Sequence, residues 1–381
     1  MELSELRKEI DSIDRELVSL FIKRMNVSAG VAEYKIKNNM PVLDASRERA
    51  LLNKVSELSG EEFEAYTRTL YSSILELSRS YQHKKIGNTS LFCKEIEKAI
   101  EETPKVFPER ATVACQGVEG AYSQIAAERL FGVPNIMFFS NWEKVFSAIE
   151  TGMCRYGVIP IENSTAGSVK KVYDLMISRK FRIVKTVRIK IDHNLLVKPG
   201  TRLEDIKEIF SHEQAISQCA GFLSTLGHSV KITPVANTAK AAQMVAESER
   251  SDVASLSSRS CAAQYGLETL VSSVQDNGNN HTRFICISKQ TEIYPGADRT
   301  SLMLVTSHRP GALYRILARF NALGINLLKL ESRPIPDRDF EFMFYFDIEV
   351  PVYSPKLAQL LAELEQECED FAYLGSYSEV I

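Results

Sequence analysis

Residues 6–35 read LRKEIDSIDRELVSLFIKRMNVSAGVAEYK, and this stretch decides the fold of the N-terminal part of the chain. Its apolar residues follow one another at alternating spacings of three and four, from Leu3 to Val31. A stripe with this period lies along one face of a single long helix, in the pattern of a heptad seam. The helix is expected to end near Asn38, shortly before Pro41.

Two shorter helices are predicted to follow, over residues 44–58 and 61–85, with Asp44 as the N-cap of the first. A first helix of about 35 residues cannot bury its whole apolar stripe against these two alone. The sequence therefore predicts a homodimer or a higher homo-oligomer.

Two cations lie on the apolar stripe of the first helix. Arg24 occupies a position where an apolar residue is due, and Lys35 follows on nearly the same face, since eleven steps of 100° return to within about 20°. Either both side chains extend to solvent, or they bind anionic partners, because unpaired buried charge is costly. Arg7 is rotated by about 100° from Arg24, so it cannot easily reach the same pocket from the same helix, but a partner subunit could supply it.

Residues 1–86 resemble the all-helical chorismate mutase family at many spaced positions, beginning with Leu6-Arg7 and including Pro41-Val42 and Arg47-Glu48. The residues that the resemblance implies for the two carboxylates of chorismate are Arg7 of the partner subunit, Arg24 and Arg47. Those implied for the ether oxygen are Lys35 and Gln82, and those implied for the ring hydroxyl and backbone contacts are Asp44, Glu48 and Ser78. A Claisen rearrangement needs only a compressed substrate and stabilisation of the developing charge.

The middle of the chain has a different pattern of apolar and charged residues. Residues 87–110 form a charged linker that is partly helical, and over residues 111–290 short apolar strands alternate with helices. This is an α/β pattern, for which we expect largely parallel strands. The length, and a pair of strands expected at residues 181–187 and 190–197, indicate two lobes with a cleft between them. The second lobe is expected over about residues 191–270.

Three polar loops in this segment are candidate ligand sites. They are GVEGAYS at residues 117–123, PIENSTAGS at residues 160–168 and NHTRF at residues 280–284. Ligands of open α/β sheets bind beyond the carboxyl ends of strands, and a helix N-terminus favours an anion. Taken alone, the first loop is better explained as a plain turn between a strand and a helix.

Together with SHEQA at residues 211–215, these loops resemble the prephenate dehydratase family over about residues 111–288. The resemblance implies a bilobed α/β domain of the periplasmic-binding-protein-like type. It also implies that Thr282 assists departure of the ring hydroxyl and that Arg283 lies near a substrate carboxylate. His281 is a titratable alternative to Thr282, but adjacent residues of a strand point to opposite faces. The other residues implied to line the cleft are Ser123, Asn163, Ser164, Gln218 and Phe284.

Residues 299–381 show the order strand, helix, strand, strand, helix, strand, which is the ferredoxin-like α+β motif. Pro310-Gly311 precedes the first helix and Ser332-Arg333 ends the second strand, and either could be a cap or a turn. Following a dehydratase-like segment, the two together resemble an ACT domain, which implies an L-phenylalanine site between two subunits. The effector residues implied are Gly311, Ala312, Leu313, Asn326, Glu331 and Ser332.

The composition excludes several classes of protein. A net charge of −3 speaks against nucleic-acid binding, and no stretch approaches the ~20 apolar residues of a membrane span. The N-terminus lacks the basic start and apolar run of a signal peptide, so a cytoplasmic location is expected. The seven cysteines are scattered without a CxxC pair, and the histidines show no metal-ligand spacing. We expect neither a metal nor a cofactor.

The resemblances predict a bifunctional enzyme of phenylalanine biosynthesis, a branch of the shikimate pathway. It would rearrange chorismate to prephenate, convert prephenate to phenylpyruvate, and be inhibited by phenylalanine. One alternative is that arogenate replaces prephenate as the dehydratase substrate. Another is a non-catalytic sensor with a bilobed cleft and an amino-acid-binding module, against which the presence of Thr282 and of the chorismate-contacting positions argues.

Overall fold

The computed structural model forms two compact units, each described here by itself. One unit contains the first 98 residues and residues 302–373, and the other contains residues 99–301 and 374–381. The residues that the structure describes are 2–86, 91–227, 229–308, 310–335 and 342–380.

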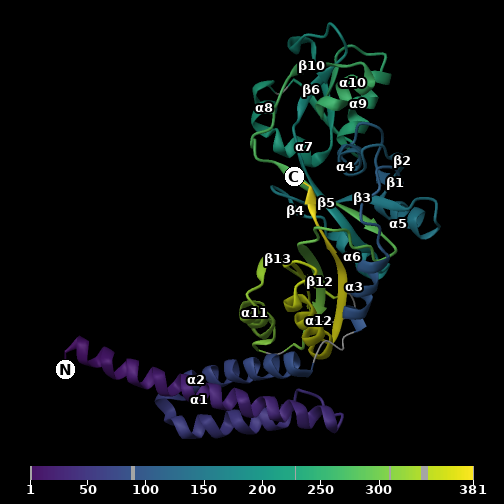
Figure 1. Ribbon diagram of the computed structural model, residues 1–381. Helices are drawn as coiled ribbons and strands as arrows, with labels where there is room; N and C mark the ends of the chain where they lie inside the picture. The colour runs from purple at the N-terminus through teal and green to yellow at the C-terminus, as the bar shows by residue number, and fades with distance from the viewer. Residues whose placement is uncertain (1, 87–90, 228, 309, 336–341, 381) are drawn as a thin grey trace. The chain divides into compact units, whose positions relative to one another are not determined.

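The first unit begins with the predicted helices, which are drawn in purple and blue in Figure 1. Helix α1 (Leu3–Lys37) is continuous, and α2 (Ala45–Ile86) is broken at Gly60, whose φ of 70° suits glycine alone. Asp44 caps α2 as predicted, because its Oδ1 accepts a hydrogen bond of 2.9 Å from the Arg47 backbone N–H. Helix α3 (Leu91–Glu102) follows within the predicted linker.

The apolar stripe of α1 is left largely exposed by the residues that the structure describes. Its side chains are between 42% and 69% exposed, which leaves a long apolar surface of the kind that marks an interaction site. The exposed members of the stripe are Leu3, Leu6, Ile10, Ile13, Leu17, Leu20, Val27 and Val31.

The C-terminal part of the chain folds as the predicted βαββαβ unit around a sheet of order β13-β14-β12-β15. Its helices pack against α2, where the Gln359 amide donates to the Ser80 carbonyl oxygen at 3.0 Å. The elements in chain order are β12 (Arg299–Val305), α11 (Ala312–Leu323), β13 (Asn326–Pro334), β14 (Phe342–Glu349), α12 (Pro355–Glu367) and β15 (Asp370–Tyr377).

The second unit contains two sheets, each covered by helices. The first sheet has the order β16-β5-β11-β3-β1-β2, with β4 beside β3. Its strands are β1 (Thr112–Gln116), β2 (Asn135–Phe139), β3 (Tyr156–Asn163), β4 (Gly167–Ser168), β5 (Arg182–Lys190), β11 (His281–Ser288) and β16 (Glu379–Val380). Its helices are α4 (Tyr122–Phe131), α5 (Trp142–Glu150) and α6 (Lys170–Ser178).

The second sheet has the order β10-β6-β9-β7-β8. Its strands are β6 (Asn194–Val197), β7 (Glu208–Ser211), β8 (Lys231–Pro234), β9 (Val253–Ser257) and β10 (Glu268–Val271). Its helices are α7 (Glu213–Gln218), α8 (Ala220–Thr225), α9 (Thr238–Glu247) and α10 (Arg259–Tyr265). In Figure 1 this lobe lies beside the one that holds β1 to β5, as the two-lobe prediction required.

Two predictions about these strands are wrong. The sheets are mixed rather than largely parallel, since β11 runs antiparallel to both β3 and β5. The chain leaves the first sheet at the C-terminal end of β5 and re-enters it at the same end as β11. The two strands therefore run in opposite directions. Moreover, β5 and β6 do not pair, because both edges of β5 are occupied by β11 and β16.

The end of the chain returns to the first sheet of the second unit. Strand β16 pairs with β5, and the Glu379 carboxylate lies 2.9 Å from Arg188 and 2.8 Å from Arg299. Residues 374–381 therefore belong with the dehydratase-like unit, whereas the sequence pattern placed them in the C-terminal domain.

Candidate active sites

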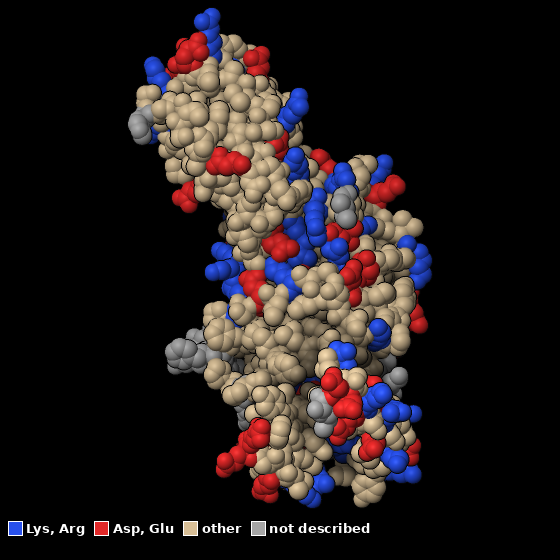
Figure 2. Space-filling model, turned by 90° about the vertical axis from the view of Figure 1, so that its left-hand side faces the viewer, with Lys and Arg blue, Asp and Glu red and all other residues tan. Residues whose placement is uncertain are grey.

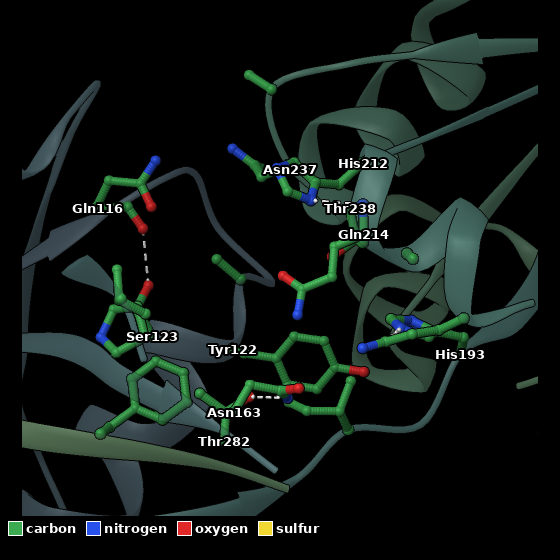
Figure 3. Close-up of a pocket in the computed structure, with 18 of the residues that line it drawn as sticks. Gln116, Tyr122, Ser123, Asn163, His193, His212, Gln214, Asn237, Thr238 and Thr282 are labelled. Carbon is green, nitrogen blue, oxygen red and sulfur yellow. Dashed lines mark hydrogen bonds between the residues drawn. The ribbon is translucent and has the colours of Figure 1, made fainter. Parts of the chain in front are cut away.

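A cleft of about 390 Å³ lies between the two lobes of the second unit (Figure 3). Five of the seven residues predicted for this cleft line it, and they come from both lobes: Ser123, Asn163, Gln218, Thr282 and Phe284. The other two, Ser164 and Arg283, do not line it.

Thr282 is held by a hydrogen bond whose direction the backbone determines. The backbone N–H groups of Thr165 and Ala166 donate to Asn163 Oδ1 at 3.0 and 2.9 Å. Because these groups can only donate, Oδ1 is the carbonyl oxygen, and Asn163 Nδ2 donates to Thr282 Oγ1 at 2.9 Å. The Thr282 hydroxyl therefore accepts from Asn163 and keeps its own hydrogen available for a ligand.

The hydrogen-bond network extends from Asn163 to His193. Asn163 Nδ2 also donates to Asn280 Oδ1 at 2.7 Å, and Asn280 Nδ2 donates to Gln218 Oε1 at 2.8 Å. Gln218 Oε1 then accepts from His193 Nε2 at 3.1 Å, which leaves the buried Nδ1 as the ring acceptor. Burial lowers the pKa of His193, against the opposing effect of the Gln218 hydrogen bond, so the neutral ring is favoured.

The cleft can hold an anion without a cationic side chain. No lysine, arginine, aspartate or glutamate is among its described lining residues. Instead, α4 and α9 begin at the cleft, through Tyr122-Ser123 and Asn237-Thr238. Asn237 Oδ1 caps α9 by accepting from the Lys240 backbone N–H at 2.7 Å. The N–H groups and the dipole at such helix starts favour carboxylates.

The structure places Arg283 on the face of β11 that is turned away from the cleft. Its Nε lies 2.6 Å from Glu162 Oε1, and the side chain is only 7% exposed. Alternation along a strand puts Thr282 and Phe284 on the cleft face and Arg283 on the other, which is also the argument against His281. The prediction that Arg283 lies near a substrate carboxylate is therefore corrected.

Ser164 supports the loop rather than the cleft. Its Oγ accepts from the His281 backbone N–H at 2.9 Å and donates to the Asn279 carbonyl oxygen at 3.2 Å. It is exposed and holds the segment that leads into β11.

Sequence reasoning missed His193, Asn280 and Trp142 as residues of this region. Trp142 lines the cleft, and its Nε1 is buried without a hydrogen-bond partner among the described residues. Asn280 stands directly before His281 in a motif that was recognised, so a signal for it was available. His193 lies in the short crossing between lobes, where no local pattern marks it.

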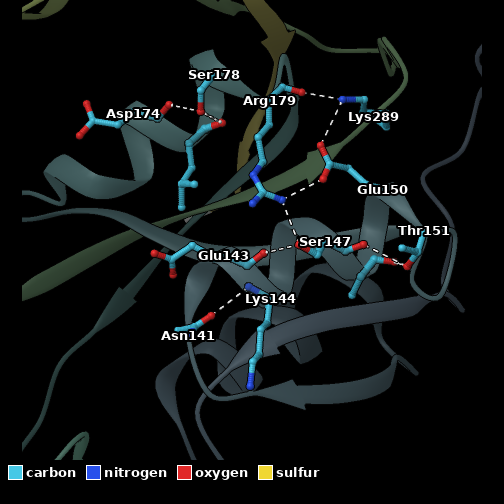
Figure 4. Close-up of polar contacts among 12 residues, drawn as sticks. Asn141, Glu143, Lys144, Ser147, Glu150, Thr151, Asp174, Ser178, Arg179 and Lys289 are labelled. Carbon is cyan, nitrogen blue, oxygen red and sulfur yellow. Dashed lines mark hydrogen bonds and ion pairs between the residues drawn. The ribbon is translucent and has the colours of Figure 1, made fainter. Parts of the chain in front are cut away.

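Polar contacts outside the cleft hold α5 and α6 in place (Figure 4). Arg179, which follows α6, donates to Ser147 Oγ at 3.0 Å and pairs with Glu150 at 2.8 Å. Lys289, just beyond β11, donates to the Arg179 carbonyl oxygen at 2.6 Å. These contacts join α5, which starts at Trp142, to the strand that carries Thr282.

A second cavity, of about 330 Å³, lies between α1 and α2 in the first unit. All of the residues predicted for chorismate except Arg7 line it: Arg24, Lys35, Asp44, Arg47, Glu48, Ser78 and Gln82. Arg7 is exposed on the N-terminal half of α1 and does not line the cavity of its own chain.

The side chains of this cavity are oriented by contacts between α1 and the end of α2. Arg24 Nη1 donates to Ser78 Oγ at 2.5 Å, and Gln82 Nε2 donates to Ser28 Oγ at 3.1 Å. Lys35 donates to the carbonyl oxygen of Val42. Burial lowers the pKa of Lys35, more than the carboxylates of Asp44 and Glu48 raise it. Lys35 thus loses its proton earlier than an ordinary lysine as the pH rises.

Arg79 is a cavity residue that sequence reasoning missed. Its Nη1 lies 2.5 Å from both carboxylate oxygens of Glu48, and its Nη2 lies 2.6 Å from Glu76. The signal for it was its place between Ser78 and Gln82 on one helical turn, where a buried arginine needs carboxylate partners.

A third cavity, of about 280 Å³, lies at the start of α11. Three predicted effector residues line it, namely Gly311, Ala312 and Leu313. The other three lie on β13 and do not. Asn326 donates to Glu349 at 2.9 Å, Glu331 lies 3.5 Å from Lys329, and Ser332 is exposed.

Over the described part of the chain, no group of three or more His, Cys, Asp or Glu side chains could hold a metal ion. None of the described helices is long and apolar enough to cross a membrane. Side chains of both signs are interspersed over the face drawn in Figure 2, in keeping with the small net charge.

Family models match the segments that contain the first two cavities. The family model of chorismate mutase type II matches residues 6–83, and that of prephenate dehydratase matches residues 113–292. A bifunctional chorismate mutase/prephenate dehydratase of Aquifex aeolicus is 31% identical over 382 residues, covering 100% of this chain and 99% of the relative. A chloroplastic arogenate dehydratase/prephenate dehydratase of Arabidopsis thaliana is 34% identical over 285 residues, covering 70% and 72%.

Two solved structures match with a TM-score of 0.64 each. A prephenate dehydratase of Arthrobacter aurescens in complex with L-Phe is 28% identical and covers 70% of this chain and 89% of its own. A protein described as a quorum quenching acylase is 30% identical and covers 71% and 98%. Fold, cavities and matched segments define an enzyme with a mutase domain and a dehydratase domain. The chain belongs to the bifunctional chorismate mutase/prephenate dehydratase family.

Proposed function

We propose that the chain converts chorismate to phenylpyruvate at two separate sites, the α1–α2 cavity and the interlobe cleft. The family assigns both activities, and with them a place in phenylalanine biosynthesis. The observation that carries the two-site proposal is that each matched segment contains a cavity of its own with groups suited to its reaction. The seven cysteines are free thiols, which agrees with a reducing, cytoplasmic location.

The test is to give the purified full-length protein chorismate alone and to follow phenylpyruvate. Prephenate should appear first and phenylpyruvate after it. Accumulation of prephenate without phenylpyruvate would contradict the dehydratase assignment, and no consumption of chorismate would contradict the mutase assignment.

In the mutase cavity, Arg24 and Arg47 would bind the two carboxylates, and Lys35 would donate to the ether oxygen. The rearrangement breaks one C–O bond and forms one C–C bond without proton transfer, so the protein supplies position and charge. Arg7 of the partner subunit would complete the site. The exposed stripe of α1 supports this dimer, whose existence sedimentation equilibrium can measure.

Gln82 would donate a second hydrogen bond to the ether oxygen. Its Oε1 is buried and has no hydrogen-bond partner in the described residues, while its Nε2 donates to Ser28. The amide oxygen and nitrogen can exchange places, because the Ser28 hydroxyl can donate as well as accept. The exchange would satisfy Oε1 and free Nε2 for the ether oxygen of the substrate.

The Gln82→Glu variant is expected to move mutase activity to acid pH. Between about pH 5 and 8 the wild-type rate should be nearly flat, since an amide does not titrate. A glutamate donates only when protonated, so its activity should fall as the pH rises past about 4.3 or the higher value that burial gives. The measurement is kcat/KM for chorismate across this range, with Gln82→Ala as the control that loses activity without gaining a pH dependence. An unshifted profile would show that Gln82 does not face the ether oxygen.

In the cleft, the helix starts of α4 and α9 would bind the carboxylates of prephenate. The bond to the departing carboxylate breaks, its electron pair completes the aromatic ring, and the ring C–OH bond breaks. Thr282 would donate its free hydrogen to the leaving oxygen, so that water departs, and its proton would be recovered from solvent. No lysine or arginine is among the described residues that line the cleft, and a carboxylate that is not held in an ion pair loses carbon dioxide more readily.

The choice between prephenate and arogenate follows from the charge of the cleft. Arogenate carries an ammonium group where prephenate carries a ketone, and a buried ammonium needs an acidic partner. No acidic side chain is among the described residues that line the cleft, which supports prephenate. A kcat/KM for arogenate equal to or above that for prephenate would contradict this preference.

The C-terminal βαββαβ domain would act as an ACT domain that binds L-phenylalanine. Its support is the cavity at Gly311, together with the exposed side chains of Asn326, Leu328, Leu330 and Ser332 along β13. In the described sheet β13 pairs only with β14, so its other edge could meet a second subunit. Effector binding there would inhibit the dehydratase from a distance, with a reciprocal coupling of about 1–3 kcal/mol.

The Gly311→Val variant is expected to remove inhibition by phenylalanine while leaving the mutase unchanged. Gly311 has a φ of 80°, which a β-branched residue adopts only with strain, so the start of α11 must rearrange. The measurement is dehydratase activity against phenylalanine concentration, with equilibrium binding of phenylalanine alongside. Wild-type affinity in this variant would place the effector elsewhere.

A further inference from the structure

A chain of buried ion pairs leads from the mutase cavity to helix α11. Arg79 bridges Glu48, which lines the cavity, and Glu76, one turn earlier on α2. Arg319 of α11 lies 3.3 Å from the second oxygen of Glu76 and 3.3 Å from Glu363 of α12. The side chains of Arg79, Glu76, Arg319 and Glu363 are at most 8% exposed.

The two arginines divide the charge of Glu76 between them. Oε1 of Glu76 faces Arg79 and Oε2 faces Arg319. With Arg319 present, Glu76 is neutralised from α11, and Arg79 remains available to Glu48. Without Arg319, Glu76 would lose its cationic partner from α11 and would draw more strongly on Arg79, because a carboxylate so deeply buried needs cations beside it.

A movement of the Arg79 side chain would change the charge of the mutase cavity. If Arg79 turns toward Glu76, Glu48 becomes an unpaired carboxylate beside the position of a dianionic substrate. Like charges at such short range repel, and Glu48 would also compete for Lys35 and Arg47.

We propose that Arg319, in the C-terminal domain, is a positioning residue of the mutase that acts through Glu76 and Arg79 to keep Glu48 neutralised in the chorismate cavity. Arg319 does not touch the substrate and does not line the mutase cavity. The inference rests on the proposed assignment of that cavity to chorismate.

The test uses the full-length protein and the Arg319→Met variant. The KM for chorismate is expected to rise roughly 3- to 30-fold, with a smaller change in kcat, as for other couplings through a packed network. Dehydration of added prephenate should stay at the wild-type rate and serve as the folding control. Arg319→Lys should restore part of the affinity, because it keeps the charge but not the two-pronged contact.

The matched control is Lys356→Met, which removes an exposed cation from α12. Lys356 is not among the residues that line the mutase cavity, and the KM should not change. A double-mutant cycle with Arg79→Met separates coupling from general damage. In the Arg79→Met background, Arg319→Met should add no further change.

An unchanged KM in a folded Arg319→Met protein would overturn the proposal, as would an equal effect of Arg319→Met in both backgrounds. If Arg319→Met does not fold, the same cycle with Arg319→Lys decides. Failure of the mutase assignment looks different. In that case Arg24→Ala would leave chorismate turnover intact, whatever Arg319 does.

Discussion

Thr282→Ala is expected to lower the dehydratase kcat by about 10²–10³-fold, the usual cost of removing one hydrogen-bond donor to developing charge. The affinity for prephenate should change little, since the Thr282 hydrogen is needed mainly as the hydroxide departs. The physical reason is the fixed direction of the bond from Asn163, which leaves the Thr282 hydrogen facing the cleft. Thr282→Ser should retain partial activity, and mutase activity should be untouched.

The measurement is steady-state kcat and KM for prephenate together with equilibrium binding. Thr225→Ala is a matched control, because that hydroxyl bonds the Phe222 carbonyl oxygen and is exposed. A tenfold weaker affinity with unchanged turnover would assign Thr282 to binding instead.

Arg24→Ala is expected to reduce chorismate turnover by about 10²–10³-fold, because the proposal gives this cation a substrate carboxylate to bind in a small cavity. Lys35→Ala should have a similar effect, since Lys35 is the proposed donor to the ether oxygen. Dehydration of added prephenate should remain near the wild-type rate, because the cleft lies in the other unit.

Lys23→Ala is the control for Arg24→Ala. Lys23 is the neighbouring cation on α1, is exposed and does not line the cavity. Loss of both activities together in a folded Arg24→Ala protein would contradict two independent sites. Each rate is measured with its own substrate, chorismate or prephenate, supplied at saturation.

Much of the first unit could be predicted because its signals are local. The spacing of the apolar residues on α1, the cap at Asp44 and the break at Gly60 each depend on residues within a few positions. Helical geometry also brings Ser78 and Gln82 to one face of α2 without any knowledge of the fold. Periodicity singled out only Arg24 and Lys35 among the cavity residues, and the other predicted ones were implied by the resemblance to the chorismate mutase family.

The alternation of side chains along β11 can be read from the sequence. It predicts that Thr282 and His281 point to opposite faces of the strand. The same alternation places Arg283 beside Glu162, on the face turned away from the cleft. The resemblance to a family suggested a substrate contact that the alternation does not allow.

The sequence by itself determined the helices of the first unit, the order of elements in the C-terminal part and the two-lobed middle. These follow from periodicity, which reports which face of an element is buried, whereas the resemblance to known families implied five residues that line the cleft and seven that line the mutase cavity. Periodicity does not report what covers that face. Only the tertiary structure decided that β5 pairs with β11 and β16 rather than with β6, and that His193 joins the network of Thr282. It also decided that Arg319 reaches Glu76, because that contact joins residues far apart in the chain whose charges pair only once helices pack.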